Sequence, residues 1–213
     1  MFLDKNIWSI STPLSDIPFE AKEAYDKVLP YVNDFLCAEH PYRKGVMCPF
    51  VPSAIKNDLI FFSYSEKKSI DMCIDVVRNL MEHYLNVRKN NEDKYISFIL
   101  MFDENFDIAN LLDIQHLTKV FCIENNIMIG ALYKESNAPS LHNENYFPLR
   151  TQVPCLVMRD LTSQDLIFLD PEQYSIEKRI GFLKSFIKRF STSNKKYDIE
   201  QVNKAKEILQ TYS

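Results

Sequence analysis

The sequence predicts an α/β or α+β fold, in which helices cover a sheet of about four strands in a single layered domain. Short apolar, β-rich runs alternate with longer stretches whose apolar residues recur at helical spacing. The chain has 213 residues, of which 46% are hydrophobic, and this is enough to build one large core. We therefore expect residues 1–213 to form one domain.

The N-terminal part is predicted to be an arm followed by one long helix. Residues 1–14 are expected to be extended and docked by Trp8. The helix is expected to start near Ser15, with Pro18 in its first turn. It should end before Pro41, because the residue before a proline disfavours the helical conformation.

The remaining elements follow from the periodicity of the apolar residues. Four strands are predicted at 58–64, 95–102, 127–133 and 155–159. Four helices are predicted at 65–89, 110–125, 175–190 and 199–212, and residues 171–213 are expected to pack on the sheet domain as C-terminal helices. Strands separated by helices allow parallel pairs, and a long loop before the last strand allows an antiparallel one.

Composition excludes several classes of function. The net charge is −4 and no basic stripe stands out, so we expect no nucleic-acid partner. Only three glycines are present, which excludes the dinucleotide-binding and phosphate-binding glycine loops. The five cysteines contain no CxxC pair, so reduced thiols are expected rather than a structural zinc site. No secretory leader and no apolar run of about 18 residues is found, so we expect a cytoplasmic protein outside the membrane.

Two segments rich in proline and histidine are the candidates for a functional site. The first is residues 40–52, and the second is a polar loop of about twenty residues at 134–153. Long ordered loops in compact domains usually carry function, so we expect the site to be built from these two segments.

His142 and Cys48 are the strongest candidates within these loops. A neutral imidazole at His142 can ligate heme iron, act as a base or bind an acid; the alternative is a loop histidine that bonds to the backbone. A thiolate at Cys48 can ligate iron or act as a nucleophile with His40 or His142 as its base. The alternative for Cys48 is a buried small residue in a turn fixed by proline.

Other loop residues are weaker candidates. His40 precedes Pro41, so it either caps the preceding helix or faces a pocket. The guanidinium groups of Arg43 and Arg150 suit a carboxylate or a heme propionate; the alternative is salt bridges to nearby acidic residues. Asn143, next to His142, is expected to contact a bound cofactor.

The motifs in these segments resemble those of an uncharacterised bacterial family. The matching residues are His40, Pro41, Arg43, Gly45, Cys48, Pro49 and Phe50 (HPxRxGxxCPF), Met128–Gly130 (MIG), Leu141–Asn143 (LHN), and Pro148, Leu149, Arg150, Val153 and Pro154 (PLRxxVP), with Arg159 downstream. The likeness covers about residues 36–170, and Ser140 stands where the family is expected to have glycine. Members often lie near natural-product assembly genes, which implies small-molecule metabolism.

The chain is also similar, in length, layout and an early element with proline and cysteine, to the heme-dependent N-hydroxylases of the YqcI/YcgG-like group. This resemblance implies a heme-dependent oxygenase acting on an amine or amino-acid-like substrate, with oxidoreductase (monooxygenase) chemistry. His142 would then be the axial ligand of the metal, and Arg43 and Arg150 would hold propionates or the substrate acid.

Three hypotheses for function therefore stay open. The first, which we favour, is the heme-dependent enzyme of small-molecule metabolism. The second is a cofactor-free Cys/His enzyme, and the third is a non-catalytic accessory or ligand-binding protein of a biosynthetic pathway. A small-molecule substrate is expected in the first two, and the sequence also allows a homodimer.

Overall fold

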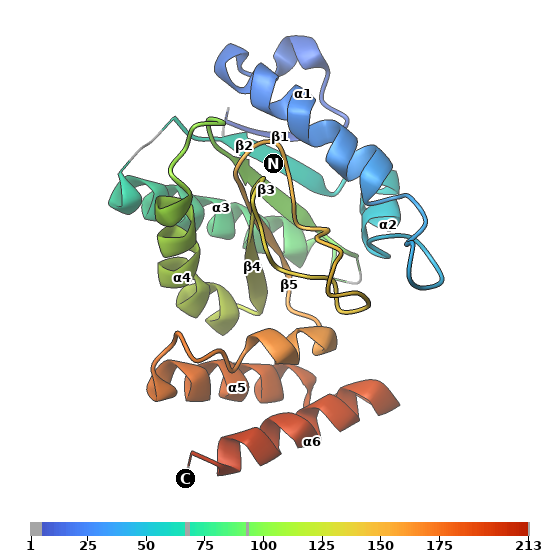
Figure 1. Cartoon of the computed structure of the whole chain (residues 1–213), viewed down its shortest axis with the longest axis vertical. Coiled ribbons are helices and arrows are strands. Elements are labelled where there is room, and N and C mark those ends of the chain that lie inside the picture. The colour runs from blue at the N-terminus through green and yellow to red at the C-terminus, as the bar shows by residue number, and fades with distance from the viewer. Residues whose placement is uncertain (1–5, 67–68, 93, 213) are drawn as a thin grey trace. The chain divides into compact units, whose positions relative to one another are not determined.

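The computed structural model describes residues 6–66, 69–92 and 94–212, and its fold is mixed α/β (Figure 1). One open five-stranded sheet, flanked by helices, has the strand order β1-β2-β3-β5-β4. β1 pairs antiparallel with β2, β2 parallel with β3, and β3 antiparallel with β5. This confirms the predicted fold class. The strands are β1 (Ile7–Ser9), β2 (Ile60–Tyr64), β3 (Ser97–Met101), β4 (Ile127–Leu132) and β5 (Cys155–Asp160).

The sheet has one strand more than the four strands located in the sequence, because the N-terminal arm contributes β1. Ile7 lies opposite Ser63 and Trp8 lies opposite Phe62, so the arm adds an edge strand to the sheet. A three-residue strand is too short to show the alternation from which strands are predicted. Residues 1–5 of the predicted arm lie outside the described residues.

One face of the sheet is covered by helices from the first third of the chain. These are α1 (Lys22–Pro30), the π-helical segment Tyr31–Phe35 that continues it, and α2 (Val51–Lys56). The ring of Tyr25 packs edge-on against Phe62, with centroids 4.9 Å apart. Helix α2 was not predicted, because six residues show less than two turns of helical periodicity.

The other face of the sheet is covered by α3 (Ile70–Lys89). Because successive side chains of a strand point to opposite faces, Phe61 packs away from Phe62 and stacks on Phe98 at 4.7 Å. Tyr84 of α3 contacts the same Phe98 ring at 5.5 Å. Helix α3 corresponds to the helix predicted at 65–89, and it begins five residues later than predicted. Helix α4 (Ile108–Glu124) then links β3 to β4.

The chain divides into two compact units. We call Met1–Leu117 with Ile129–Arg159 the sheet unit, and Thr118–Met128 with Asp160–Ser213 the C-terminal unit. The prediction of a single domain over 1–213 stays a prediction. Both candidate loops belong to the sheet unit.

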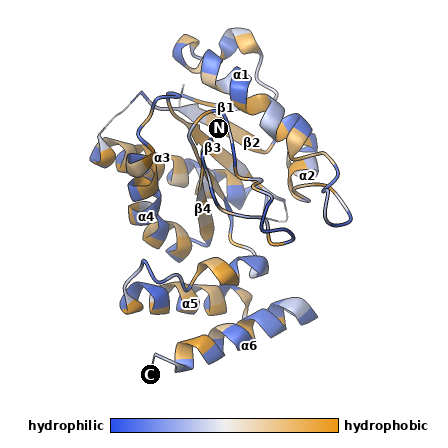
Figure 2. Cartoon of the chain, in the orientation of Figure 1, coloured by the Kyte–Doolittle hydropathy of each residue, from blue (hydrophilic) through white to orange (hydrophobic). Residues whose placement is uncertain are grey.

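The C-terminal unit contains a 3-10 helix (Ser163–Phe168), α5 (Ile176–Phe190) and α6 (Lys196–Gln210). Hydrophobic and hydrophilic residues alternate along α5 and α6, as expected for helices with one apolar side (Figure 2). Helix α6 begins three residues before the predicted start at 199. The apolar side chains form one core cluster that includes Leu166, Phe182, Leu183, Phe186 and Val202.

Of the helices that the structure describes, none combines the length and the apolar character needed to span a membrane.

Candidate functional site

The first loop, residues 40–50, is held by a short antiparallel ladder. Glu39 and Val46 form a β-bridge, and the His40 N–H donates to the Gly45 carbonyl at 2.9 Å. Further along, the Met47 N–H donates to the Ala38 carbonyl at 2.8 Å. Gly45 has a φ of +93°, a left-handed conformation that side chains disfavour, so glycine is what allows the turn.

The side chain of Arg43 holds this loop together by hydrogen bonds to its backbone carbonyls. Its Nη1 donates to the Lys44 carbonyl at 3.0 Å, and its Nη2 donates to the carbonyls of Val46 and Met47 at 2.7 and 2.9 Å. A guanidinium has five N–H donors, and three bonds here go to the backbone. The main contacts of Arg43 therefore shape the turn.

The second loop, residues 134–153, is ordered by its own backbone. The Ser140 N–H donates to the Tyr146 carbonyl at 2.7 Å, and the Tyr146 N–H donates to the Asn143 carbonyl at 3.2 Å. The Asn143 side-chain Oδ1 accepts from the Asn145 N–H at 2.8 Å. The Ser140 hydroxyl oxygen accepts from the His142 N–H at 3.2 Å. Asn143 thus forms a local turn that presents His142.

Two further bonds anchor the second loop. Arg150 Nε donates to the Ser136 carbonyl at 2.8 Å, and its guanidinium lies 4.3 Å from the centroid of the Phe147 ring. The Tyr31 hydroxyl, from the end of the first helical segment, donates to the Pro148 carbonyl at 2.8 Å. Burial raises the pKa of Tyr31 well above its usual value, so the hydroxyl keeps the proton that it donates.

The structure brings the two loops together at their histidines. The rings of His40 and His142 meet edge to face with centroids 5.3 Å apart, although about one hundred residues separate them in the sequence. The centroid of the Tyr146 ring lies 5.8 Å from that of His40 and 5.4 Å from that of Tyr42. The Tyr146 hydroxyl also donates to the Met47 sulfur at 3.6 Å. We call His40, His142, Tyr42 and Tyr146 the imidazole cluster.

The two imidazoles have different environments. His40 is 8% exposed, and its Nδ1 accepts the Tyr42 N–H at 3.0 Å. Burial, together with the nearby charges of Arg43 and His142, lowers the pKa of His40 below its usual value. In the neutral ring the proton therefore sits on Nε2, which is a donor. His142 is exposed, and among the described residues its ring nitrogens have no hydrogen-bond partner.

Cys48 does not join this pair. Its side chain is partly buried against the core cluster of the sheet unit, and its N–H donates to the Leu36 carbonyl at 2.9 Å. Within the described residues no hydrogen bond links its sulfur to either imidazole. Sequence reasoning did not single out Tyr42 and Tyr146, which complete the cluster. The available signal was an aromatic residue within four positions of each histidine.

A heme needs an axial ligand, cations for its propionates and an apolar pocket. Among the described residues the ring nitrogens of His142 have no hydrogen-bond partner, but Arg43 donates to three loop carbonyls, and Arg150 donates to the Ser136 carbonyl and the Asn137 side chain. The surroundings of His142 are exposed and polar, and a groove of about 540 Å³ elsewhere in the sheet unit is lined by no residue of either loop. These residues do not fit a heme as a set. Within the described residues there is also no group of three or more His, Cys, Asp or Glu side chains placed to hold a metal ion.

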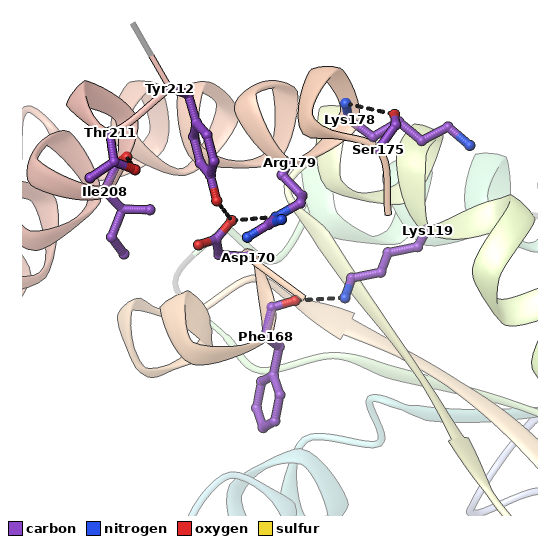
Figure 3. Close-up of polar contacts among 9 residues, drawn as sticks. All are labelled: Lys119, Phe168, Asp170, Ser175, Lys178, Arg179, Ile208, Thr211 and Tyr212. Carbon is purple, nitrogen blue, oxygen red and sulfur yellow. Dashed lines mark hydrogen bonds and ion pairs between the residues drawn. The ribbon is translucent and has the colours of Figure 1, made fainter. Parts of the chain in front are cut away.

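The C-terminal unit has a second group of polar contacts, shown in Figure 3. Asp170 accepts from Arg179 Nε and from the Tyr212 hydroxyl, each at 2.6 Å. Burial acts to raise the pKa of Asp170, but the hydrogen bonds from Arg179 and Tyr212 outweigh it and hold that pKa below its usual value. Lys119 Nζ donates to the Phe168 carbonyl at 2.7 Å. These groups satisfy one another, so we interpret them as structural.

The fold and the site together define a mixed α/β protein in which two loops of the sheet unit present a pair of imidazoles. The chain belongs to the family described as Domain of unknown function (DUF6875), whose model matches residues 25–200. This bears out the expected membership of an uncharacterised family, over a longer stretch than the motifs cover. Neither the curated proteins nor the solved structures provide a match to the chain.

Proposed function

We propose that this protein is an enzyme that acts on a small polar molecule by acid–base chemistry at the His40–His142 pair. The observation that carries the proposal is the division of roles between two imidazoles 5.3 Å apart. One is buried and held as a neutral donor, and the other is exposed with free ring nitrogens. Such a pair can hold a substrate oxygen with one group while the other moves a proton.

His40 would act as the hydrogen-bond donor to a substrate oxygen. Because its Nδ1 accepts the Tyr42 N–H, its Nε2–H can donate to a carbonyl or carboxyl oxygen as negative charge develops there. Burial lowers the pKa of His40, and the Arg43 charge adds to this, so the ring resists protonation and stays neutral near pH 7. Its Nε2 carries the proton in this tautomer, so His40 is not suited to be the base through that atom.

His142 would act as the proton carrier. Its exposed ring can take a proton from a substrate and return it to product or solvent. The Tyr42 and Tyr146 rings beside the pair offer flat surfaces against which a small planar group can pack. The substrate class that these contacts favour is a small molecule with a carbonyl or carboxyl oxygen next to an exchangeable proton.

The test is turnover of a defined panel of keto acids, aldehydes, esters, amides and amino acids, followed by mass spectrometry with the full chain. We expect at least one panel member to be converted. His142→Gln should lower kcat by about 10²–10⁴-fold, the usual contribution of a general acid or base. His40→Asn keeps a side-chain acceptor but removes the Nε2–H, and it should lower kcat by about 10²-fold.

The matched controls are His83→Gln, in α3, and Cys48→Ser. Both should leave the rate within about twofold of the unmodified protein, because neither side chain belongs to the imidazole cluster. No conversion by the unmodified chain, or equal rates for His142→Gln and His83→Gln, would refute the proposal. Loss of activity in Cys48→Ser alone would instead favour the cofactor-free Cys/His enzyme.

The heme-dependent oxygenase is a weaker candidate, because the residues do not fit a heme as a set; in its favour, the ring nitrogens of His142 have no hydrogen-bond partner among the described residues. A hemin titration followed by absorption spectroscopy tests it. A stoichiometric Soret band that disappears in His142→Ala would favour heme over the acid–base enzyme. A weak band that is unchanged in that variant would count against the heme.

A further inference from the structure

Cys37 and Cys48 lie on adjacent backbone segments at the base of the first loop. The antiparallel bridge pairs Glu39 with Val46, and the Met47 N–H donates to the Ala38 carbonyl. Next to it, the Cys48 N–H donates to the Leu36 carbonyl at 2.9 Å, so the two hydrogen bonds flank Cys37 and bring its backbone beside that of Cys48. A disulfide needs Cα atoms about 4.4–6.8 Å apart, which requires two backbone segments as close as those that these hydrogen bonds join.

The two side chains also have similar surroundings. Both are partly buried, and both pack against the core cluster of the sheet unit that includes Val32 and Val51. The other three cysteines of the chain differ in this respect: Cys73, Cys122 and Cys155 are at most 1% exposed. A dissolved oxidant can therefore reach the first pair far more easily than the other thiols.

The two thiols are not equivalent. The Cys37 thiol donates a long hydrogen bond to the Val32 carbonyl at 3.7 Å. Burial raises the pKa of Cys37, and the neighbouring Cys48 and Asp34 raise it further, so this sulfur keeps its proton. Cys48 Sγ makes no hydrogen bond within the described residues. Cys48 is therefore the better first nucleophile and Cys37 the better second one.

We propose that Cys37 and Cys48 form an oxidisable dithiol that reduces a hydroperoxide and closes into a disulfide. In the first step the Cys48 thiolate attacks one peroxide oxygen, the O–O bond breaks, and Cys48 becomes a sulfenic acid as water or an alcohol leaves. In the second step the Cys37 sulfur attacks the Cys48 sulfur, the S–O bond breaks, and Cys37 loses its proton as water leaves. Two thiols are oxidised and one peroxide is reduced.

The disulfide would close a short ring around the turn that presents His40 and Arg43. It would tie the two strands of the ladder covalently where hydrogen bonds now hold them. The inference does not depend on the proposed function, because it uses neither imidazole.

The experiment exposes the folded, reduced full chain to hydrogen peroxide at low protein concentration and measures intact mass. We expect loss of two hydrogens per chain, reversed by dithiothreitol. Trypsin cuts after Arg43 and Lys44, between the two cysteines, so a disulfide links two peptides that otherwise separate. Non-reducing peptide mapping should find that link.

Three variants make the result decisive. Cys48→Ser should show no loss of hydrogens, and Cys37→Ser should accumulate a sulfenic acid at Cys48 that dimedone traps. Cys73→Ser, at a buried thiol, should behave as the unmodified chain. The proposal fails if peroxide leaves both thiols reduced, if Cys48 proceeds to sulfinic acid without a link, or if Cys37 pairs mainly with another cysteine.

Discussion

The two loops of the sheet unit and the polar cluster of the C-terminal unit use arginine and tyrosine in opposite ways. In the loops, Arg43 and Arg150 donate to carbonyls of their own segments, and among the described residues the ring nitrogens of His142 have no hydrogen-bond partner. In the C-terminal unit, Arg179 and Tyr212 share the carboxylate of Asp170. Charged groups that satisfy one another stabilise a fold, whereas charged groups that satisfy the backbone can shape a turn around a reactive side chain.

The largest expected effect concerns Lys119 in the C-terminal unit. Burial lowers the pKa of Lys119 to about 8, opposed by the charge of Asp165, while the unfolded chain keeps the usual value near 10.5. Below pH 8 both states are charged and the folded state bears the full cost of burial; above about pH 10.5 both are neutral. The free energy of unfolding should therefore rise between pH 8 and 10.5, by on the order of 3 kcal/mol.

Urea unfolding at several pH values, with Lys119→Met beside the unmodified chain, measures this term. Lys119→Met should flatten the rise, because methionine fills similar space without a charge. Lys184→Met, at an exposed lysine of α5, is the control and should leave the rise intact. If both variants keep the same pH dependence, Lys119 is not the buried charge that we describe.

The next largest effect is expected at Asp170. Asp170→Ala leaves the Arg179 side chain, of which 16% is exposed, without its carboxylate partner and removes the acceptor for the Tyr212 hydroxyl. We expect a loss of about 2–3 kcal/mol in the free energy of unfolding, below the range for a fully buried pair because these side chains are partly exposed. Urea unfolding followed by circular dichroism measures it.

The matched control for Asp170 is Asp75→Ala, since the Asp75–Arg78 ion pair is 3.5 Å long and well exposed. Its loss should stay within about 0.5 kcal/mol.

Acid unfolding gives a second check on Asp170. Because the pKa of Asp170 is held below its usual value, its contribution is present above the unfolded-state pKa and is lost as the pH falls through the folded-state value. If Asp170→Ala and Asp75→Ala lower the free energy of unfolding equally, the Asp170 contacts stabilise the fold no more than an exposed ion pair does.

The smallest effect is expected where the second loop is anchored. Tyr31→Phe removes the bond from the hydroxyl to the Pro148 carbonyl and should lower the free energy of unfolding by about 1 kcal/mol. It should also speed hydrogen exchange at the Tyr146 amide. Tyr25→Phe is the control, because its hydroxyl lies 3.5 Å from the Ile10 carbonyl and forms a weaker bond. Unchanged exchange in Tyr31→Phe would mean that this bond does not order the loop.

Much of the fold could be predicted from periodicity. The long helices and the four longer strands carry enough turns or alternations to be recognised, and their positions agree with the structure to within about five residues, except that the first α-helix begins at Lys22 rather than near Ser15. The elements that were missed are short: β1, α2 and the 3-10 helix at Ser163–Phe168. Such elements are decided by pairing and packing with distant residues, which a local pattern does not contain.

The candidate site was predicted in part. Proline, histidine and arginine in two loops marked the segments, and His40, His142 and Arg43 do lie in ordered turns. The sequence did not show that Arg43 would bond to the backbone, that Arg150 would bond within its own loop, or that Tyr42 and Tyr146 would flank the pair. These contacts depend on the three-dimensional path of the chain, which a local sequence pattern does not describe.

The sequence by itself therefore determined the fold class, the order of the longer elements and the two loops that are rich in chemistry. Only the tertiary structure decided that β1 completes the sheet, that His40 and His142 meet, and that the Cys48 N–H bonds to the Leu36 carbonyl, next to Cys37. The physical reason is the range of the interactions. Helical and strand periodicity can be recognised from a few neighbouring residues. Burial, ring contacts and hydrogen-bond partners, in contrast, depend on segments far apart in the chain.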